Sequence, residues 1–570
     1  MQLVRRFQPA LFCAFAVLAC ELISHPYVTM GVCDDGLYIL MVRTLAATGH
    51  VVYNGWAAPM LTGQLYLAAA MVKLFGFSST TIRVSTLLVS MALAFLLQRI
   101  LVRTNITERN ATIGTLAFVL SPIYLLMSFT FMTDIFGLFA IVVCIYGCLR
   151  ALQASTSRAA IVWLCFAVAA NAICGTSRQI AWLGILVMVP STLWLLSAQR
   201  RVLIGGTAAT LAGCIFIFAC LQWLKHQPYM VPEHLLPNTF PLAHTLEQLV
   251  KTFLDVPFLL LPIVILFIPE IRKNHPRVNA AIVAVSLVYA RLAIHRAYLP
   301  LLEPTQHDWV TVYGIFNGFV LKGTPPIFLN IRVQVLLTIA CFGGILGLVA
   351  SLRHLRRTPP ASGSLTGTSW RQLGILLAPF IIVYSLLLVP RATTTDGIYD
   401  RYLLPLLVVA LICLVRYYQD RIQPRIPLAS VLLVAMTAIY GITVTHNTFS
   451  LYRARVRIAS EIRAAGVPDT SVDNGWEYNL GVELQTADHI NNPVVLIPAH
   501  AYAPTPPPPA GACDMFWYDE TPHMHPLYGV SFDPNACYGS APFAPVHYSR
   551  WLAFAPGTLY VVRYIAPTRP

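Results

Sequence analysis

Long apolar stretches constrain this chain more than any other feature of its sequence. Runs of about 17 to 25 mostly apolar residues recur as far as residue 445, and a helix of that length crosses the roughly 30 Å hydrocarbon core of a bilayer. The chain is 57% hydrophobic and only 11% charged, with a mean hydropathy of +0.66. These values exclude an ordinary soluble protein of 570 residues. The sequence therefore predicts an all-α polytopic membrane protein.

Counting the apolar stretches predicts about 13 transmembrane helices. The first, after MQLVRR, has features of a signal peptide, but we predict an uncleaved anchor that holds the following residues at the membrane surface. A further segment at 59–75 is predicted to be an interfacial or half-inserted helix. The predicted spans are 8–24, 80–98, 111–127, 132–149, 159–175, 179–197, 202–224, 252–269, 279–295, 331–351, 372–389, 402–416 and 426–445.

The basic residues agree with this count. The formal net charge is +14, and with the N-terminus inside, alternate connections carry the clusters of arginine and lysine. Each cluster then lies on the cytoplasmic side, as the positive-inside rule requires. A full crossing at 59–75 would reverse all later loops and break this agreement. The clusters are Arg5/Arg6, Arg99/Arg103/Arg109, Arg150/Arg158, Arg200/Arg201, Arg272/Lys273/Arg277, Arg353/Arg356/Arg357/Arg371 and Arg416/Arg421/Arg425.

The tail at 447–570 is predicted to form a small α/β domain outside the membrane, after a transmembrane domain at 1–446. It begins with a basic helical stretch, YRARVRIASEIRAAG, with Gly466 as its C-cap. The strand-like runs PVVLIPAH and TLYVVRYIAP follow, separated by the proline-rich segment APTPPPPAG. Cys513 and Cys537 are the only cysteines in this tail, and the sequence leaves open whether they form a disulfide.

Ionisable residues at the outer membrane edge are the candidates for chemistry, because charges there are costly unless they are paired, hydrated or used. They come from distant parts of the sequence, yet the predicted topology places them on one membrane face. They are Asp34, Asp35, Arg43, Asp134, Arg178, Arg391, Asp396, Asp400 and Arg401.

Asp34 and Asp35 begin the first outer loop, at 25–79. An amphipathic helix follows, with Leu37, Met41 and Leu45 on one face, and such a helix would hold a carboxylate at headgroup depth. Repulsion and partial desolvation raise the pKa of one member of an adjacent acidic pair, which suits a general base. The alternative is that the pair caps the helix, and the residues alone favour neither interpretation.

Three further candidates have both a structural and a chemical interpretation. Asp134 begins a span and either caps it or belongs to a site. Arg178 lies in a connection of a few residues, where it either extends to the interface or binds a phosphate through two parallel hydrogen bonds. Arg401 either pairs with Asp400 or serves such a site.

Several familiar motifs are absent from the sequence. It has no Walker loop, GxGxxG motif, GxSxG elbow or cysteine-based zinc pattern, and its 15 histidines show no metal-ligand spacing. We therefore predict no metal, no cofactor and no nucleic-acid partner. An enzyme of this kind needs a donor substrate that the membrane supplies.

Four segments resemble one class of enzymes. The segments are DDGLYILMVRTLAATGH, PMLTGQLYLAAAMVKLFGFSSTTIRVSTLLVS, SPIYLLMSFTFMTDIFGLFA and DRYLLPLL. In order and spacing they are similar to glycosyltransferases of the GT-C fold that use lipid-linked sugars. The nearest are bacterial aminoarabinose transferases and protein O-mannosyltransferases, grouped as glycosyltransferase family 39 and its neighbours. The resemblance covers residues 10–200 and the region near 400, and it is weak across 225–370.

The resemblance implies roles for individual residues. In that family the first acid of an Asp-Glu pair in the first outer loop is the catalytic carboxylate, which matches Asp34, and the second position is Asp35 here. Tyr38 and Arg43 match the family's aromatic and basic positions on the following helix, and Asp134 matches the acid that begins the fourth span. Thirteen spans and an outer C-terminal domain are also implied.

The chain departs from the family pattern in one place. Relatives often carry a lysine or histidine just before the proline of the next loop motif, where it reaches the donor phosphate. This chain has Ala57-Ala58-Pro59 there. The resemblance therefore implies that Arg178 or Arg401 contacts the phosphate, or that the donor site is altered.

These features together predict an inverting glycosyltransferase in the bacterial inner membrane. We expect Asp34 to be the base, Arg178 and Arg401 to hold a polyprenyl-phosphate sugar, and Asp134 to orient the site. The acceptor is a hydroxyl of a lipid, glycan or protein on the outer face. The alternatives are a transporter or flippase of a lipid-linked sugar and a surface-polysaccharide polymerase or ligase. Charges on one face, and the lack of an internal repeat, favour an enzyme over a transporter.

Overall fold

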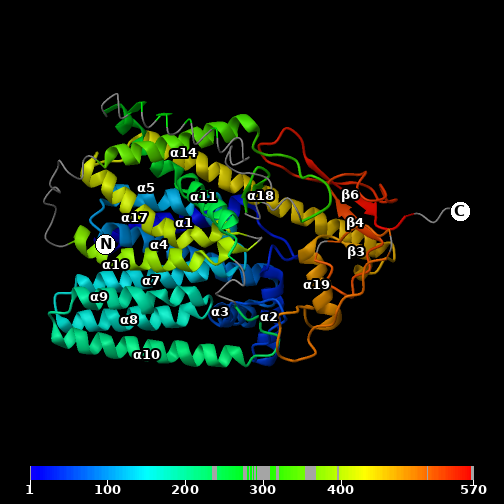
Figure 1. The fold of residues 1–570 in the computed structure, drawn as a ribbon, viewed down its shortest axis with the longest axis horizontal. Coiled ribbons are helices and arrows are strands. Elements are labelled where there is room, and N and C mark those ends of the chain that lie inside the picture. Colours follow the sequence, from blue (N-terminus) through cyan, green and yellow to red (C-terminus); the bar gives the residue numbers. More distant parts are fainter. Residues whose placement is uncertain are drawn as a thin grey trace.

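The structure is a bundle of long helices with a small sheet at one end (Figure 1). It is a computed structural model that describes residues 2–233, 240–273, 309–315, 320–352, 367–394, 397–509, 511–515 and 517–566, with a few isolated positions between 279 and 291. The bundle is the membrane part, and the sheet belongs to the C-terminal tail (Figure 1).

Nine helices among the described residues are long and apolar enough to cross a membrane. Two bent pairs raise this number to eleven: α5 (Glu108–Val119) with α6 (Pro122–Ser128), bent by 71°, and α11 (Leu242–Leu259) with the segment Leu261–Lys273, bent by 73°. The chain is therefore a multi-pass membrane protein. The nine are α1 (Gln2–Ser24), α4 (Ser79–Arg103), α7 (Thr133–Leu152), α8 (Ser157–Gly175), α10 (Arg200–Lys225), α14 (Ile331–Ser351), α16 (Trp370–Leu388), α17 (Leu404–Arg421) and α18 (Leu428–Ala464).

Prolines account for several irregular spans. The stretch predicted at 111–127 breaks where Pro122 begins α6, since proline has no N–H to continue the preceding helix. The stretch predicted at 179–197 is a 3₁₀ turn (η1, Gln179–Trp182), a π-helical turn (η2, Gly184–Met188) and a short helix (α9, Val189–Leu195). Leu261–Lys273 divides into α12 (Leu261–Val264) and a 3₁₀ segment (η3, Ile265–Lys273).

The span predicted at 279–295 lies largely outside the described residues, so the count of 13 stays a prediction.

Two short helices of the first loop lie between the bundle and the tail (Figure 1). They are α2 (Asp35–Thr48) and α3 (Thr62–Phe75), each of 14 residues. At 1.5 Å per residue each is about 21 Å long, which is too short to cross the hydrocarbon core. The prediction that 59–75 is not a full crossing agrees with this length. Helix α2 buries Leu37, Met41 and Leu45 on one face, as its amphipathic pattern predicts.

The tail is an α/β unit that continues directly from the last span. Helix α18 is a single helix of 37 residues, so the predicted boundary at 446/447 falls inside it, and it ends just before Gly466, whose φ is +85°. A sheet of order β3-β4-β6-β5 packs beside α19 (Trp476–Ala487). Its strands are β3 (Val472–Asp473), β4 (Tyr528–Ser531), β5 (Val546–Tyr548) and β6 (Gly557–Arg563).

One of the two predicted tail strands is confirmed and the other is wrong. The run TLYVVRYIAP contains all of β6 but its first residue. Strand β6 pairs antiparallel with β4, and β3 pairs parallel with the other edge of β4. The run PVVLIPAH forms turns instead of a strand. Its two prolines cannot donate to a strand ladder, which is a physical reason for this difference. Cys513 and Cys537 form a disulfide in this tail.

Short elements complete the described fold. A two-stranded antiparallel ladder joins β1 (Val310–Thr311) and β2 (Gly314–Ile315). Three 3₁₀ turns occur at η4 (Arg391–Thr393), η5 (Asp400–Leu403) and η6 (Asp469–Ser471). Turns η4 and η5 connect α16 to α17, and this connection faces the first loop across the end of the bundle.

The tail docks on the first loop through backbone contacts. The N–H of Ile490 donates to the carbonyl of Asn54 at 2.8 Å, and the side chain of Asn492 donates to the carbonyl of Gly55 at 2.9 Å. Gly55 has a φ of +84°, and a Cβ there would lie 2.6 Å from the carbonyl oxygen of Ile490. This close approach requires glycine, and it brings the tail to the same end of the bundle as α2.

Candidate functional site

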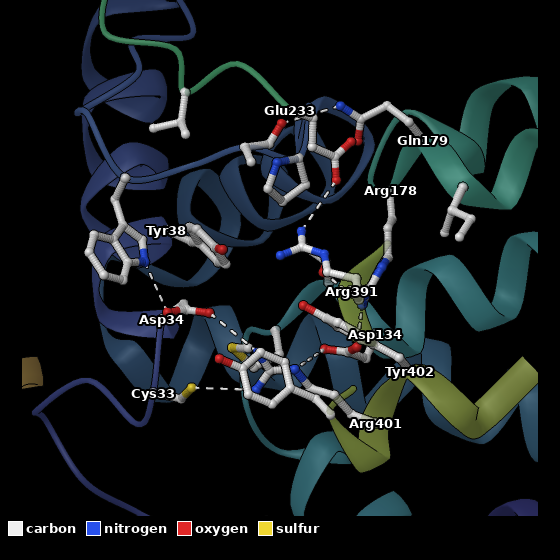
Figure 2. Close-up of a pocket in the computed structure, with 18 of the residues that line it drawn as sticks. Cys33, Asp34, Tyr38, Asp134, Arg178, Gln179, Glu233, Arg391, Arg401 and Tyr402 are labelled. Atoms are coloured by element: carbon white, nitrogen blue, oxygen red, sulfur yellow. Dashed lines mark hydrogen bonds and ion pairs between the residues drawn. The ribbon is translucent and has the colours of Figure 1, made fainter. Parts of the chain in front are cut away.

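A cavity of about 1060 Å³ lies where the first loop, the start of α7, the connection from α16 to α17 and the tail meet. Of the seven residues to which the sequence analysis gives a role in catalysis or substrate binding, five line this cavity and two do not. Asp35 and Arg43 are the two outside the lining. The five that line it are Asp34, Tyr38, Asp134, Arg178 and Arg401 (Figure 2).

Asp34 presents its carboxylate to the cavity. It holds the N-cap position of α2, but its side chain makes no capping hydrogen bond, so the capping alternative for Asp34 is wrong. Its Oδ1 accepts a hydrogen bond from Trp56 Nε1 at 2.9 Å, and its Oδ2 lies 4.0 Å from Arg401 Nη2. Burial raises the pKa of Asp34, while Arg401 and the Trp56 hydrogen bond act in the opposite direction. A carboxyl group in this setting is suited to accepting a proton.

Asp35 points away from the cavity and is fully hydrogen-bonded. Its Oδ2 accepts from Arg83 Nε at 2.8 Å and from the N–H of Phe131 at 3.1 Å. Its Oδ1 accepts from Arg83 Nη2 at 3.0 Å and from the N–H of Val32 at 2.6 Å. The side chains of both ion-pair partners are 0% exposed. This geometry favours a positioning role, in which Asp35 ties the first loop to α4, and its predicted catalytic role stays a prediction.

Asp134 lies in the first turn of α7 and forms an ion pair with Arg178. The N-cap of α7 is Met132, so Asp134 does not cap the helix. Its Oδ2 lies 3.9 Å from Arg401 Nε and has no hydrogen-bond partner among the described residues. A Cβ at Gly137, one turn later, would lie 3.1 Å from Arg178 Cδ. The glycine therefore lets the stem of Arg178 pack against α7.

The guanidinium groups of Arg178 and Arg401 lie over aromatic rings. The central carbon of Arg178 is 4.7 Å from the centre of the Tyr402 ring, and that of Arg401 is 4.5 Å from the centre of the Tyr399 ring. Planar arginine groups stack well on such rings, which fixes their orientation without using their N–H groups. Asp400, the alternative partner of Arg401, accepts a hydrogen bond from the N–H of Val310 at 2.8 Å.

Arg391 adds a third guanidinium group to this cavity (Figure 2). It lies 3.8 Å from Glu233, and the two side chains are 46% and 45% exposed, so this pair is at the solvent side of the site. Asp396, another candidate, falls outside the described residues. Arg43 is exposed on α2 and does not line the cavity. Its predicted substrate contact stays a prediction.

Sequence reasoning missed several lining residues. Trp56 directly precedes the segment Ala57-Ala58-Pro59 that departs from the family pattern, and Tyr402 follows Arg401, so both had a local signal. The residues from the tail had none, because they lie far from the motifs in sequence. They include Trp476, Glu477, Asn492, Trp517 and Glu520.

No group of three or more His, Cys, Asp or Glu side chains in the described part of the chain could hold a metal ion. The cavity instead combines carboxylates, guanidinium groups and aromatic rings. Such a set can bind a phosphate, accept a proton and stabilise a phosphate leaving group. The fold and the cavity together define a multi-pass membrane protein with a charged site at one end of its helices.

The solved structures that are similar to this chain include the following three. ArnT from Cupriavidus metallidurans, bound to undecaprenyl phosphate, is 15% identical with a TM-score of 0.41, over 98% of this chain and 99% of that one. The oligosaccharyltransferase of Archaeoglobus fulgidus, in complex with zinc and sulfate, is 14% identical with a TM-score of 0.45, over 90% and 67%. The S. cerevisiae protein O-mannosyltransferase Pmt1-Pmt2 complex, bound to the sugar donor, is 14% identical with a TM-score of 0.32, over 38% and 32%.

Two of these three proteins are sugar transferases by name, an oligosaccharyltransferase and a protein O-mannosyltransferase. No protein-family model and no curated protein matches the chain. Because the TM-scores and identities are this low, the function proposed below depends on the residues of the cavity rather than on these similarities.

Proposed function

We propose that the protein transfers a sugar from a polyprenyl-phosphate carrier to an acceptor hydroxyl, with inversion at the anomeric carbon. One observation carries the proposal: the carboxylate of Asp34 and the guanidinium groups of Arg178, Arg391 and Arg401 share one cavity at the end of a membrane bundle. The sequence has no loop for a nucleotide phosphate, and a lipid-linked donor reaches such a cavity from the membrane.

Arg401 is the best-placed contact for the donor phosphate. Its distances of 4.0 Å to Asp34 and 3.9 Å to Asp134 exceed hydrogen-bond length, so charge attraction holds it while N–H groups remain for a ligand. Stacking on Tyr399 sets the plane of its guanidinium group. Arg178 is held by Asp134 and adds positive charge, which stabilises a phosphate whose charge rises as it leaves.

The reaction is a single displacement. The acceptor oxygen bonds to the anomeric carbon as the bond from that carbon to the phosphate oxygen breaks, and the electron pair of the broken bond goes to the phosphate. Asp34 accepts the proton of the acceptor hydroxyl. Asp134 positions Arg178 and Arg401, and Tyr38 closes the cavity one turn beyond Asp34 on α2.

The proposed setting is the outer face of a bacterial inner membrane. The arginine and lysine clusters support this orientation, because it places them all in cytoplasmic connections. The cavity and the tail then share the opposite face, where acceptor lipids, glycans or proteins are available. The partners are a polyprenyl-phosphate sugar and one of these acceptors.

Asp34→Asn tests the proposal. Asparagine keeps the shape of the side chain but cannot accept the proton, so we expect transfer to fall by roughly 10²- to 10⁴-fold. Mass spectrometry of envelope lipids, glycans and glycoproteins identifies the product by comparing cells with and without the gene. The rate of its formation is then compared between the variants.

Asp514→Asn is the matched control. Asp514 has the same side chain, is 94% exposed and does not line the cavity. We expect it to retain full transfer. Undiminished transfer by a folded Asp34→Asn protein would remove Asp34 as the base.

A further inference from the structure

Three tryptophan side chains form one wall of the cavity. Trp56 comes from the first loop, Trp476 from the start of α19 and Trp517 from a turn of the tail. The rings of Trp56 and Trp476 are stacked at 30°, with centres 5.8 Å apart. The rings of Trp56 and Trp517 meet edge to face at 80°, with centres 5.7 Å apart. We call these three residues the tryptophan wall.

Tail contacts hold the tryptophan wall together. The bonds from Ile490 and Asn492 to the first loop fix the backbone next to Trp56. The N–H of Asn491 donates to the carbonyl of Glu520 at 3.3 Å, which connects the same tail segment to the turn that carries Trp517. All three indoles are only partly buried and all line the cavity, so they have surface available to a ligand.

Asp34 lies at the boundary between the tryptophan wall and the arginines. Its Oδ1 accepts the hydrogen bond from Trp56, and its Oδ2 faces Arg401. Figure 2 shows Arg178, Arg391 and Arg401 together on one side of Asp34. If a phosphate occupies the arginine side, an acceptor that gives its proton to Asp34 approaches from the other side, along the tryptophan wall.

The wall has the chemistry of a site for a sugar ring. The C–H groups on one face of a pyranose are weakly positive, and they pack favourably on the electron-rich face of an indole. Glu520 lies three residues after Trp517 and also lines the cavity. A carboxylate there accepts hydrogen bonds from sugar hydroxyls and repels a phosphorylated acceptor.

We propose that Trp56, Trp476 and Trp517 form an acceptor subsite, and that the acceptor is an uncharged sugar ring of a glycan. The wall holds the ring so that one of its hydroxyl groups reaches Asp34. This proposal rests on the sugar transfer proposed above and names its acceptor class. It also assigns the tail a direct part in substrate binding.

Binding of small sugars, without turnover, tests the subsite. The protein in lipid nanodiscs is titrated with methyl glycosides of glucose, galactose, mannose and N-acetylglucosamine, and contact is detected by saturation-transfer NMR. A blocked serine amide is the competing probe for a protein acceptor. We expect at least one methyl glycoside to bind, and its Kd to rise at least about fivefold in Trp476→Ala and Trp517→Ala.

Matched variants make the result specific. Trp194 is 74% exposed on α9 and does not line the cavity, so Trp194→Ala should bind the glycoside as the unaltered protein does. Trp476→Phe and Trp517→Phe keep an aromatic face and should restore most of the affinity, as expected if the aromatic face binds the sugar.

The proposal is overturned if no methyl glycoside binds, if the alanine variants bind as well as the unaltered protein, or if the serine amide alone binds. These outcomes are distinct from failure of the proposed function. Asp34→Asn should still bind the glycoside while losing transfer. Loss of transfer in Asp34→Asn with unchanged binding in the tryptophan variants would keep the enzyme and reject the tryptophan wall.

Discussion

Asp34 and Asp35 are neighbours in sequence with opposite surroundings. Asp35 accepts four hydrogen bonds in a fully buried position, two of them from Arg83. Asp34 accepts one from Trp56 and directs its other oxygen toward the cavity. Environment rather than residue type decides what a carboxylate does, because only a group with accessible lone pairs can accept a proton from a substrate.

The pH dependence of transfer follows from Asp34. A general base works only when it is deprotonated, and burial raises the pKa of Asp34. As the pH is lowered, activity should therefore be lost at a higher pH than it would be with an ordinary aspartate as the base. Trp56→Phe removes a hydrogen bond to the charged form, which raises the pKa further and moves the acid limb to still higher pH.

The measurement is kcat/KM as a function of pH, with Trp194→Phe as the control, since Trp194 is remote from the cavity. The position of the acid limb is compared, not the maximum, because Trp56 also contacts the proposed acceptor. An acid limb that stays in place or moves to lower pH in Trp56→Phe would contradict this account of Asp34.

The ion pair of Arg83 and Asp35 should contribute much of the free energy that stabilises the first loop. Arg83→Ala leaves the carboxylate of Asp35 buried without its charge partner, and such a loss costs roughly 3–5 kcal/mol. Arg43→Ala, on exposed α2 surface, should change stability by less than about 0.5 kcal/mol. Thermal unfolding in detergent compares the two. Equal effects would show that Asp35 does not depend on Arg83.

At the scale of elements, short irregular segments rather than the long helices build the cavity. The first loop, the connection that carries η4 and η5, and the tail with α19 supply most of its charged and aromatic side chains. The long helices hold these segments in place, as rigid scaffolds commonly do for functional loops. Contacts between segments, such as that of Gly55 with Ile490, therefore decide whether the site forms.

Gly55→Ala should loosen the tail from the first loop. Alanine at Gly55 combines an unfavourable φ of +84° with a Cβ 2.6 Å from the carbonyl of Ile490. Gly49 has a similar φ of +78°, but nothing lies within 4 Å of its Cβ position, so Gly49→Ala has only the conformational cost of roughly 1–2 kcal/mol. We expect the tail of Gly55→Ala to be cut faster in limited proteolysis than that of Gly49→Ala. Similar cleavage of both would show that the close contact is unimportant.

At the scale of the whole molecule, two ends of one bundle have different chemistry. Helix α7 has Asp134 in its first turn, at the cavity, and ends at Leu152 near Arg150, so its 20 residues connect the charged site to a basic end. Helix α18 has 37 residues, about 55 Å at 1.5 Å per residue, and extends from the bundle into the tail. The tail and the cavity thus share an end, opposite the connection between α7 and α8 (Figure 1).

Cysteine labelling tests the orientation. Gln485→Cys, exposed on α19, should react with an impermeant thiol reagent in cells with a permeabilised outer membrane. Ser155→Cys, exposed between α7 and α8, should react only after the inner membrane is lysed, because the basic residues Arg150 and Arg158 flank its connection. The unsubstituted chain gives the background from its own free cysteines. The reverse pattern would place the cavity in the cytoplasm and end the proposed use of an outer-face acceptor.

The sequence by itself determined the class of protein, and it assigned roles to five residues that line the cavity. Apolar length and the position of arginines are local properties, so they can be read along the chain. The order of the motifs led to Asp34, Tyr38, Asp134 and Arg401, and the predicted topology led to Arg178. The breaks in the proline-containing spans and the absence of a strand at 493–500 were harder to predict from the sequence. The reason is that the same apolar residues are compatible with several backbone conformations.

Only the tertiary structure decided which of two adjacent aspartates faces the cavity and which tail residues complete it. The direction of Asp34 and Asp35 depends on Arg83 in α4 and Trp56 in the loop, and the tryptophan wall joins residues from opposite ends of the chain. Such contacts arise from packing between distant segments. They leave no periodicity or local motif, which is the physical reason why the sequence could not reveal them.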